Sequence, residues 1–517
     1  MPCGRGERAV AIVVTVTGLV AGACADDTAP SPERPAAASV ATVPLTLAST
    51  LPASAAQTAS SISAASSSTA ASLPAVSPAP TSAAPPANND CAGYGTPAQG
   101  PIVFPIAARP PQRFLVDAAG APILIQGDAA WSIIVQLTHD EVDQYLADRK
   151  ARGFNTILVN LLEHKFSSKA PDNIMGDSPF STPGDFSTPN EAYFANADWV
   201  LQRARDEGFI VLLAPAYVGY KDTDEGWLEE MMASGPDKLR EYGRYVGQRF
   251  GSLGNILWVE AGDNTFDGMD LVNAVAEGIA ETDPDALQTA HTARHSVAAD
   301  EWAKFPWFNV NNVYGSDDVG ALADKAEQQS DQPFFMIEGV YEYEHDVTTE
   351  LLRAQAYDAV LAGATGQVFG NNPIWYFDGV GLFTAPMTWQ QALGSPGSQS
   401  MEVLGALFHS LEWWKLVPDT DQPIADAGSD GGPGQMRGAV ACDGSVAVVY
   451  VTGGGALSIH TDRLRAGTIA FRWYDPSSGT TTSITDAPTP VEGAVTLETP
   501  GKNEGGDDDW VLVAASS

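Results

Sequence analysis

The sequence predicts an α/β protein, a (β/α)₈ TIM barrel followed by a small antiparallel β-sandwich domain. From residue 112 onward, short apolar runs alternate with polar, helix-like stretches, the pattern of a parallel sheet covered by helices. Eight such runs precede residue 418, which suits a closed barrel, although an open doubly wound sheet could use six or seven of them. Beyond residue 418 the runs become shorter and are separated by Gly, Pro and Asp clusters, as is typical of antiparallel strands.

The eight runs of the predicted barrel are followed by loops or by stretches with helical spacing. They are residues 122–128, 155–161, 209–217, 255–263, 287–292, 308–314, 334–339 and 366–370. A helix is predicted after Thr138, because Thr138 and Glu141 have the spacing of a capping box, and another between Asn190 and Gly208. A long loop at 163–189 is expected to overhang the barrel mouth.

The strands predicted for the last domain are residues 446–451, 457–460, 469–474, 495–497 and 510–513. We assign residues 91–417 to the barrel and 418–517 to the sandwich. The sandwich holds no convincing catalytic pair, which favours a structural role, with carbohydrate binding as the alternative.

The first 90 residues are interpreted as targeting and spacer sequence. Arg5 and Arg8 precede an apolar run at 9–20 and the small residues before Cys24, so residues 1–24 are predicted to be a signal peptide. Cys24 resembles the lipidated cysteine of a bacterial lipobox, although Ala21 stands where Leu is usual, so a plain signal peptide remains the alternative. Residues 25–90 are mostly Ala, Ser, Thr and Pro, contain no aromatic residue and are predicted to be a disordered linker.

Charge and cysteine usage point to a protein that works outside the cell. The chain has 64 acidic and 27 basic residues, a formal net charge of −37, which makes nucleic acid a poor partner. We expect a monomer that is secreted or held at the bacterial surface, with membrane contact only through a lipid on Cys24. In that oxidising compartment Cys91 and Cys442 are expected either to pair as a disulfide or to stay as separate thiols.

Polar residues end several of the predicted barrel strands, and in a barrel such ends converge on one face. No H-E-x-x-H pair, G-x-S-x-G elbow, phosphate loop or metal-ligand spacing of histidines is present, so no metal or cofactor is expected. Carboxylates and aromatic rings remain, which is the equipment of glycoside hydrolysis. The strand-end residues are Asp128, Asp263, His291, Tyr314 and Glu338.

The sequence resembles the apiosidase-like glycoside hydrolases, in which a barrel is followed by a small domain once labelled collagen-binding. The resemblance spans roughly residues 112 to 515. Its motifs include RFLVD at 113–117, GDAAW at 127–131, WVEAGD at 258–263, FMIEGVYE at 335–342, YDAVLAGATGQVFGNNPIW at 357–375, WYDPSSG at 473–479 and DWVL at 509–512.

The resemblance implies that Asp263, at the end of strand four, is the acid/base and that Glu338, at the end of strand seven, is the nucleophile of a retaining glycosidase. Glu260, three residues before Asp263, is not expected to be catalytic. The candidates for binding the sugar are Asp128, Trp131, His291, Tyr314, Glu342 and Trp375. The polymer is expected to be a plant or microbial polysaccharide, and apiose is the sugar that the resemblance implies. A non-catalytic carbohydrate- or matrix-binding protein on a barrel scaffold is the alternative function.

Overall fold

The computed structural model describes Cys91 and residues 100–220, 223–264, 268–420, 422–427, 434–490 and 493–517. The predicted signal peptide, the lipidation of Cys24 and the linker at 25–90 lie outside these residues. Within the described part of the chain, no helix combines the length and the apolar composition that crossing a membrane requires.

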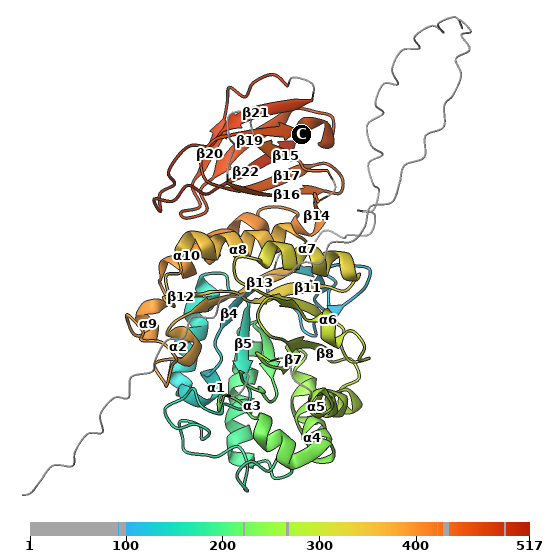
Figure 1. The fold of residues 1–517 in the computed structure, drawn as a ribbon, viewed down its shortest axis with the longest axis vertical. Coiled ribbons are helices and arrows are strands. Elements are labelled where there is room, and N and C mark those ends of the chain that lie inside the picture. The colour runs from blue at the N-terminus through green and yellow to red at the C-terminus, as the bar shows by residue number, and fades with distance from the viewer. Residues whose placement is uncertain are drawn as a thin grey trace, which may run out of the picture. The chain divides into compact units, whose positions relative to one another are not determined.

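Eight parallel strands form a curled sheet with helices around it (Figure 1). Each strand overlaps one of the eight predicted runs. The order in the sheet is β8-β7-β6-β5-β4-β13-β11-β10, so β4, the first of these strands along the chain, pairs with β13, the last. The strands are β4 (Ile125–Ala129), β5 (Thr156–Asn160), β6 (Ile210–Ala214), β7 (Ile256–Ala261), β8 (Leu287–His291), β10 (Asn311–Tyr314), β11 (Phe334–Glu338) and β13 (Gly366–Asn371).

The sheet has one seam, between β8 and β10, where no regular ladder is formed. The backbone N–H groups of Asn309 and Val310 both donate to the Gln288 carbonyl, at 3.1 and 3.2 Å. The Asn312 side chain donates to the Thr289 hydroxyl and the Ala290 carbonyl, at 2.7 Å each. These contacts close the curled sheet where strand pairing does not.

The helices follow the strands as the sequence predicts. Thr138 caps α2 with a full capping box, and Asn190 caps α3 through its side chain. Helix α4 is broken at Gly235, which has a non-helical φ of 75° and is followed by Pro236. The helices are α1 (Ile133–Gln136), α2 (His139–Ala151), α3 (Glu191–Asp206), α4 (Leu228–Phe250), α5 (Met269–Thr282), α6 (Ala299–Trp302), α7 (Val319–Gln329), α8 (Thr349–Leu361), α9 (Trp389–Ala392) and α10 (Pro396–His409).

The C-terminal domain is built from two antiparallel sheets, which confirms the predicted β-sandwich after the barrel. One sheet has the order β14-β16-β17-β22-β19-β20 and the other β15-β18-β21. All five predicted runs are strands: β17 (Val446–Thr452), β18 (Ala456–His460), β19 (Ile469–Tyr474), β21 (Ala494–Glu498) and β22 (Trp510–Ser516). Four strands were missed, namely β14 (Leu416–Pro418), β15 (Ala425–Ala427), β16 (Gln435–Ala441) and β20 (Thr481–Ile484).

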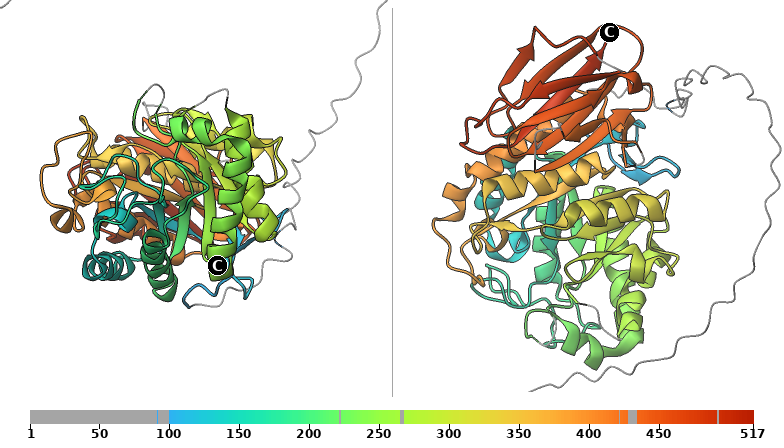
Figure 2. Two further views of the ribbon diagram at one scale, coloured as in Figure 1. Left: turned by 90° about the horizontal axis from the view of Figure 1, so that it is seen from below. Right: turned by 45° about the horizontal axis from the view of Figure 1, so that its top comes forward.

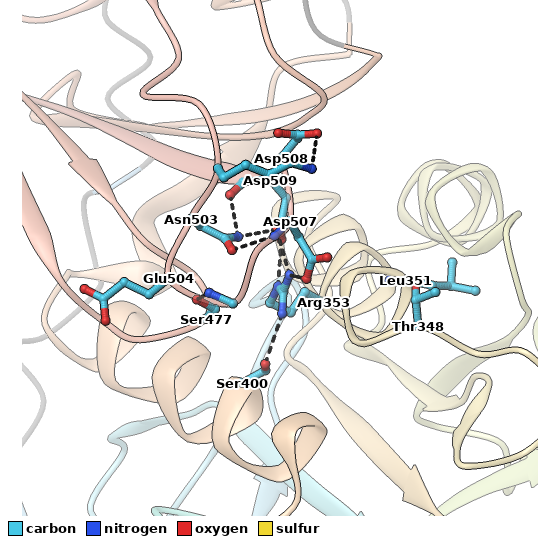
Figure 3. A network of polar contacts seen from close by, with 12 residues as sticks. Thr348, Leu351, Arg353, Ser400, Ser477, Asn503, Glu504, Asp507, Asp508 and Asp509 are labelled. Carbon is cyan, nitrogen blue, oxygen red and sulfur yellow. Dashed lines mark hydrogen bonds and ion pairs between the residues drawn. The ribbon is translucent and has the colours of Figure 1, made fainter.

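The six-stranded sheet packs on α8, and most residues of this helix are buried (Figures 1 and 2). At the junction the Arg353 guanidinium donates to both carboxylate oxygens of Asp509 at 2.7 Å and to Asp507 at 2.7 Å (Figure 3). Cys91 and Cys442 form a disulfide with a Cα–Cα distance of 5.8 Å. The C-terminal domain is therefore joined to the barrel by buried charges and a covalent bond.

Candidate active site

A cavity of about 380 Å³ lies at the carboxyl ends of the barrel strands. Five of the residues expected in the site line it: Trp131, Asp263, Tyr314, Glu338 and Trp375. Three polar strand-end residues, Asp263, Tyr314 and Glu338, therefore meet on one face, as parallel strands in a barrel allow.

Asp263 and Glu338 are joined by the His291 side chain. The Nδ1 atom of His291 lies 3.1 Å from Oδ1 of Asp263, and Nε2 lies 2.6 Å from Oε2 of Glu338. The second contact is a hydrogen bond, whereas the geometry of the first does not meet hydrogen-bond criteria. One ligand atom from each of the three residues lies within 4.8 Å of the others.

The electrostatics of this cluster favour a protonated Asp263. Burial and, after it, the negative charge of Glu338 raise the pKa of Asp263 to about 7, against the opposing effects of His291 and Tyr217. Burial alone would lower the pKa of His291, but the two carboxylates outweigh burial and raise it. Near neutral pH the cluster can therefore hold a proton on Asp263 while His291 donates to Glu338.

The backbone before Asp263 is unusual and places the carboxyl beside Tyr217. Ala261 ends β7 with a φ of 68°, a left-handed conformation that costs a residue with a side chain about 1–3 kcal/mol. A Cβ atom on Gly262 would come within 2.9 Å of the Tyr217 ring. Strain at the first residue and the absent side chain at the second allow Asp263 and Tyr217 to approach each other.

Aromatic residues from other strands surround Glu338. The Trp131 indole donates to the Tyr341 hydroxyl at 3.0 Å, and this hydroxyl interacts in turn with the Glu338 carboxyl. A Cβ atom on Gly370 would lie 2.7 Å from the Tyr341 ring, so this glycine makes room for the ring. Tyr341, which the sequence analysis did not single out, therefore links Trp131 to the proposed nucleophile.

Among the described residues that line the cavity, Arg294 supplies the permanent positive charge. Its Nε and Nη2 atoms donate to the Tyr314 hydroxyl at 3.3 and 3.1 Å, and the guanidinium lies 5.3 Å from the centre of the Tyr314 ring. Its positive charge opposes the rise of the Asp263 pKa, as the larger effect of His291 also does.

Asp128, expected in the sugar pocket, lies elsewhere. Its side chain is fully buried and faces α2, where it accepts a hydrogen bond from Tyr145 at 2.8 Å and forms an ion pair with Arg149 at 3.3 Å. Burial raises its pKa to about 6 against the opposing effect of these two partners. Asp128 therefore secures α2 to the first strand rather than lining the cavity.

Glu342 is also outside the cavity. It belongs to β12 (Tyr341–Glu342), which pairs with the end of β13, and neighbouring residues of a strand point in opposite directions. Tyr341 lines the cavity, so Glu342 faces away and accepts hydrogen bonds from Ser395, from Gly397 N–H at 2.8 Å and from Asn371 at 2.8 Å. It holds the start of α10 and does not line the cavity, so its expected role in binding the sugar is wrong.

His291 has a different position from the one expected. It does not line the cavity but lies behind Asp263 and Glu338, with 1% of its side chain exposed. Glu260 is buried among residues that face the helices, with Tyr242 of α4 among its neighbours, and burial raises its pKa well above the usual value. The Glu260 side chain therefore points away from the cavity.

Several lining residues were missed. The signal for Tyr217 was present, because it ends the third apolar run, and Tyr341 lies within the FMIEGVYE segment. Phe166, Arg294 and Glu344 come from loops, where the sequence offers no periodicity to show which side chains turn inward.

Asp263, His291 and Glu338 are residue types that could ligate a metal, and their ligand atoms are close together. The two imidazole nitrogens, however, face different carboxylates, so the three side chains do not point at a common centre in this arrangement. The geometry fits a proton-sharing cluster better than a metal site.

Comparisons with known proteins agree with this geometry. Residues 109–415 match the family described as "Apiosidase-like, catalytic domain", and residues 418–515 match the "Putative collagen-binding domain of a collagenase". A solved structure described as a glycoside hydrolase has 20% sequence identity and a TM-score of 0.69, covering 80% of this chain and 99% of that one. A glycoside hydrolase family 5 protein from Bacteroides vulgatus has the same identity and TM-score, covering 81% of this chain and 95% of that one. The search of curated proteins found no match.

Proposed function

Because the chain belongs to the apiosidase-like glycoside hydrolases, we propose that it is a retaining glycosidase with Asp263 as acid/base and Glu338 as nucleophile. The observation that carries the proposal is the close approach of the two carboxyls, one oxygen of each lying within 4.8 Å of the other. Retaining enzymes hold their carboxyls about 5–5.5 Å apart, whereas inverting enzymes need about 6.5–9.5 Å to admit a water molecule. The short separation supports retention.

The charges of the cluster suit both steps of this reaction. In the first, a carboxylate oxygen of Glu338 forms a bond to the anomeric carbon while the bond to the leaving oxygen breaks, and Asp263 gives its proton to that oxygen. In the second, the Asp263 carboxylate takes a proton from water, whose oxygen displaces Glu338 from the anomeric carbon. His291 forms a hydrogen bond with one oxygen of Glu338, and together with the Tyr341 hydroxyl it holds this carboxyl in place.

For the substrate we propose a pentofuranoside or related branch sugar of a plant or microbial polysaccharide, with apiose as the first sugar to test. The cavity supports a sugar ligand because Trp131, Tyr217, Tyr314 and Trp375 supply flat rings against which a sugar ring can pack.

The place of action is proposed from the sequence alone. We propose that residues 1–24 direct export, that Cys24 carries a lipid and that residues 25–90 are a spacer to a barrel at 91–417 and a sandwich at 418–517. Cys24→Ser should release the mature protein from the membrane fraction or leave it unprocessed. A mature N-terminus away from Cys24, found by mass spectrometry, would leave secretion as the remaining alternative.

For the C-terminal domain we propose a structural role rather than binding to collagen or carbohydrate. The face of its larger sheet is occupied by α8, and the Tyr357 and Tyr450 rings stack across this contact with centres 4.6 Å apart. Two further polar contacts, Gln435 to Asp358 at 2.7 Å and Arg437 to Asp324 at 2.5 Å, use the same face.

A panel of aryl glycosides that includes furanosides tests the proposed activity, with NMR used to identify the anomer that forms first. We expect hydrolysis with retention of configuration, and we expect Asp263→Ala to keep activity on substrates with good leaving groups, which need little protonation. An inverted first product, or wild-type turnover by Glu338→Ala, would overturn the assignment. If the protein hydrolyses none of these glycosides, the result counts against the proposed glycosidase activity itself.

A further inference from the structure

Besides Asp263 and Glu338, the carboxyls of Glu225 and Glu344 line the cavity, and that of Glu344 has no role in the two steps above. Glu344 lies in the turn after β12, and its Oε1 atom accepts a hydrogen bond from the Trp375 indole at 3.0 Å. Among the described residues no other hydrogen bond and no ion pair to this carboxyl is formed, although the positive charge of Arg294 lies near enough to oppose the rise of its pKa. One of its oxygens is therefore free to meet a ligand in the cavity.

The backbone around this pair is strained on both loops. Tyr343 and His345, on either side of Glu344, have φ values of 67° and 50°, and Phe377 and Asp378, soon after Trp375, have 49° and 58°. Such conformations cost residues with side chains about 1–3 kcal/mol each and persist where the surrounding structure enforces them, often at ligand sites. The strain supports a role for the positions of Glu344 and Trp375 beyond filling space.

The charge of Glu344 suits a neutral, hydroxyl-bearing ligand. Burial raises its pKa to about 7, Trp375 opposes the shift, and the nearby charge of Glu338 adds to it. A carboxyl that titrates near neutral pH and forms no ion pair can exchange hydrogen bonds with a sugar hydroxyl without breaking a buried ion pair.

We propose that Glu344 is a specificity-determining residue, whose free oxygen makes a hydrogen bond to one hydroxyl of the glycosyl unit that packs against Trp375. The proposal rests on the proposed glycosidase function and deepens it. The Trp375 indole, a donor only, fixes the carboxyl through its other oxygen, so the acceptor that faces the substrate has a set direction.

The test compares Glu344→Met with the wild type on the best aryl glycoside and on its set of monodeoxy analogues. We expect Glu344→Met to lower kcat/KM about tenfold on the parent glycoside, the value of one hydrogen bond. On the analogue that lacks the contacted hydroxyl, the two proteins should be nearly equal. Glu344→Gln, which keeps a polar group of the same size, should recover most of the loss.

Glu342→Gln is the matched control, because this neighbouring carboxylate is buried outside the cavity. It should reduce stability while leaving the ratio of parent to deoxy activity unchanged. If Glu344→Met reduces activity equally on every analogue, Glu344 serves only to hold Trp375, and the proposal is wrong.

Calorimetry with free monosaccharides separates this proposal from the proposed function. If the wild type hydrolyses no glycoside but binds a sugar with an affinity that Glu344→Met lowers, the glycosidase function fails and the recognition role stands. If the wild type hydrolyses the glycosides and Glu344→Met leaves the relative activities on the deoxy analogues unchanged, the glycosidase function stands and the role of Glu344 in recognition fails. A protein that neither cleaves nor binds sugars would overturn both.

Discussion

Two buried groups of charged residues in this molecule balance their charges in opposite ways. We call Asp263, His291 and Glu338 the cavity cluster and Arg353, Asp507 and Asp509 the junction cluster. At the junction the Asp509 carboxylate is fully buried and accepts hydrogen bonds from Arg353, from the Tyr450 hydroxyl at 2.8 Å and from Asn503 at 2.7 Å. Burial alone would lower the pKa of Arg353, but the aspartates outweigh burial and raise it.

The cavity cluster has two carboxyls that share one imidazole, and an open space on one side. Repulsion and burial raise the pKa of Asp263 there, whereas the junction holds its charges with a permanent cation and fixed hydrogen bonds. The difference shows how similar residues serve two purposes. Full pairing stabilises a contact, and incomplete pairing keeps a proton available for chemistry.

The largest expected effect is on activity, at the cavity cluster. Glu338→Ala should lower kcat/KM by about 10⁴-fold or more, because it removes the proposed nucleophile. The melting temperature should change little, because the variant relieves the repulsion with Asp263 but also removes the hydrogen bond with His291. Steady-state kinetics and thermal unfolding of the same preparation measure both quantities. A large loss of stability would show that the cavity cluster, too, is mainly structural.

At the junction cluster the expected effect is on stability. Arg353→Met leaves Asp509 buried without its cation and should lower the free energy of unfolding by about 3–5 kcal/mol, measured with denaturant. Activity per folded molecule should remain near that of the wild type. Lys238→Met, which breaks an ion pair with Asp185 in which Lys238 is 44% exposed, is the control and should cost far less stability. Equal losses in the two variants would contradict the distinction.

The disulfide gives a smaller effect at the same end of the molecule. Cys91→Ser should lower the free energy of unfolding by about 2–4 kcal/mol, because the bond restricts the unfolded chain. Turnover at temperatures below the unfolding transition should be unchanged, because the cavity cluster does not contact either cysteine. Cys442→Ser should behave in the same way, and a difference between the two would point to a role for one free thiol.

The smallest effects concern pH. Asp263 has a pKa of about 7 and must be protonated to act as the acid, so kcat/KM should fall above pH 7 by about tenfold for each pH unit. A pH–rate profile on a substrate with a poor leaving group measures this, and a substrate with a good leaving group should show a weaker decline. Activity that stays constant to pH 9 on both would contradict the assignment of Asp263.

The same shift predicts a pH-dependent effect on stability. The raised pKa stabilises the folded state below the ordinary value of 3.8, and this contribution is lost as the pH rises through about 7. Asp263→Asn should therefore raise the melting temperature at pH 8 and change it little below pH 4. Asp509→Asn at the junction should lower the melting temperature at pH 8 instead, since its charge is fully paired.

The sequence alone determined the architecture and the two proposed catalytic positions. Apolar runs and capping residues such as Thr138 are local signals, and they located all eight barrel strands and helix α2. The carboxyl ends of parallel strands meet on one face of a barrel, so their positions at strand ends already predict that Asp263 and Glu338 lie near each other. The resemblance to the apiosidase-like family assigned their roles.

Only the tertiary structure decided which way each polar side chain points. Barrel strands are buried on both faces, so their apolar runs do not alternate, and the sequence does not show that Asp128 turns to α2 while Asp263 meets the cavity. Nor does the sequence show that Tyr341, which was not singled out, lines the cavity while its neighbour Glu342, expected to bind the sugar, faces away. The loop residue Glu344 had no periodicity at all, and its place beside Trp375 follows from the meeting of two loops distant in sequence.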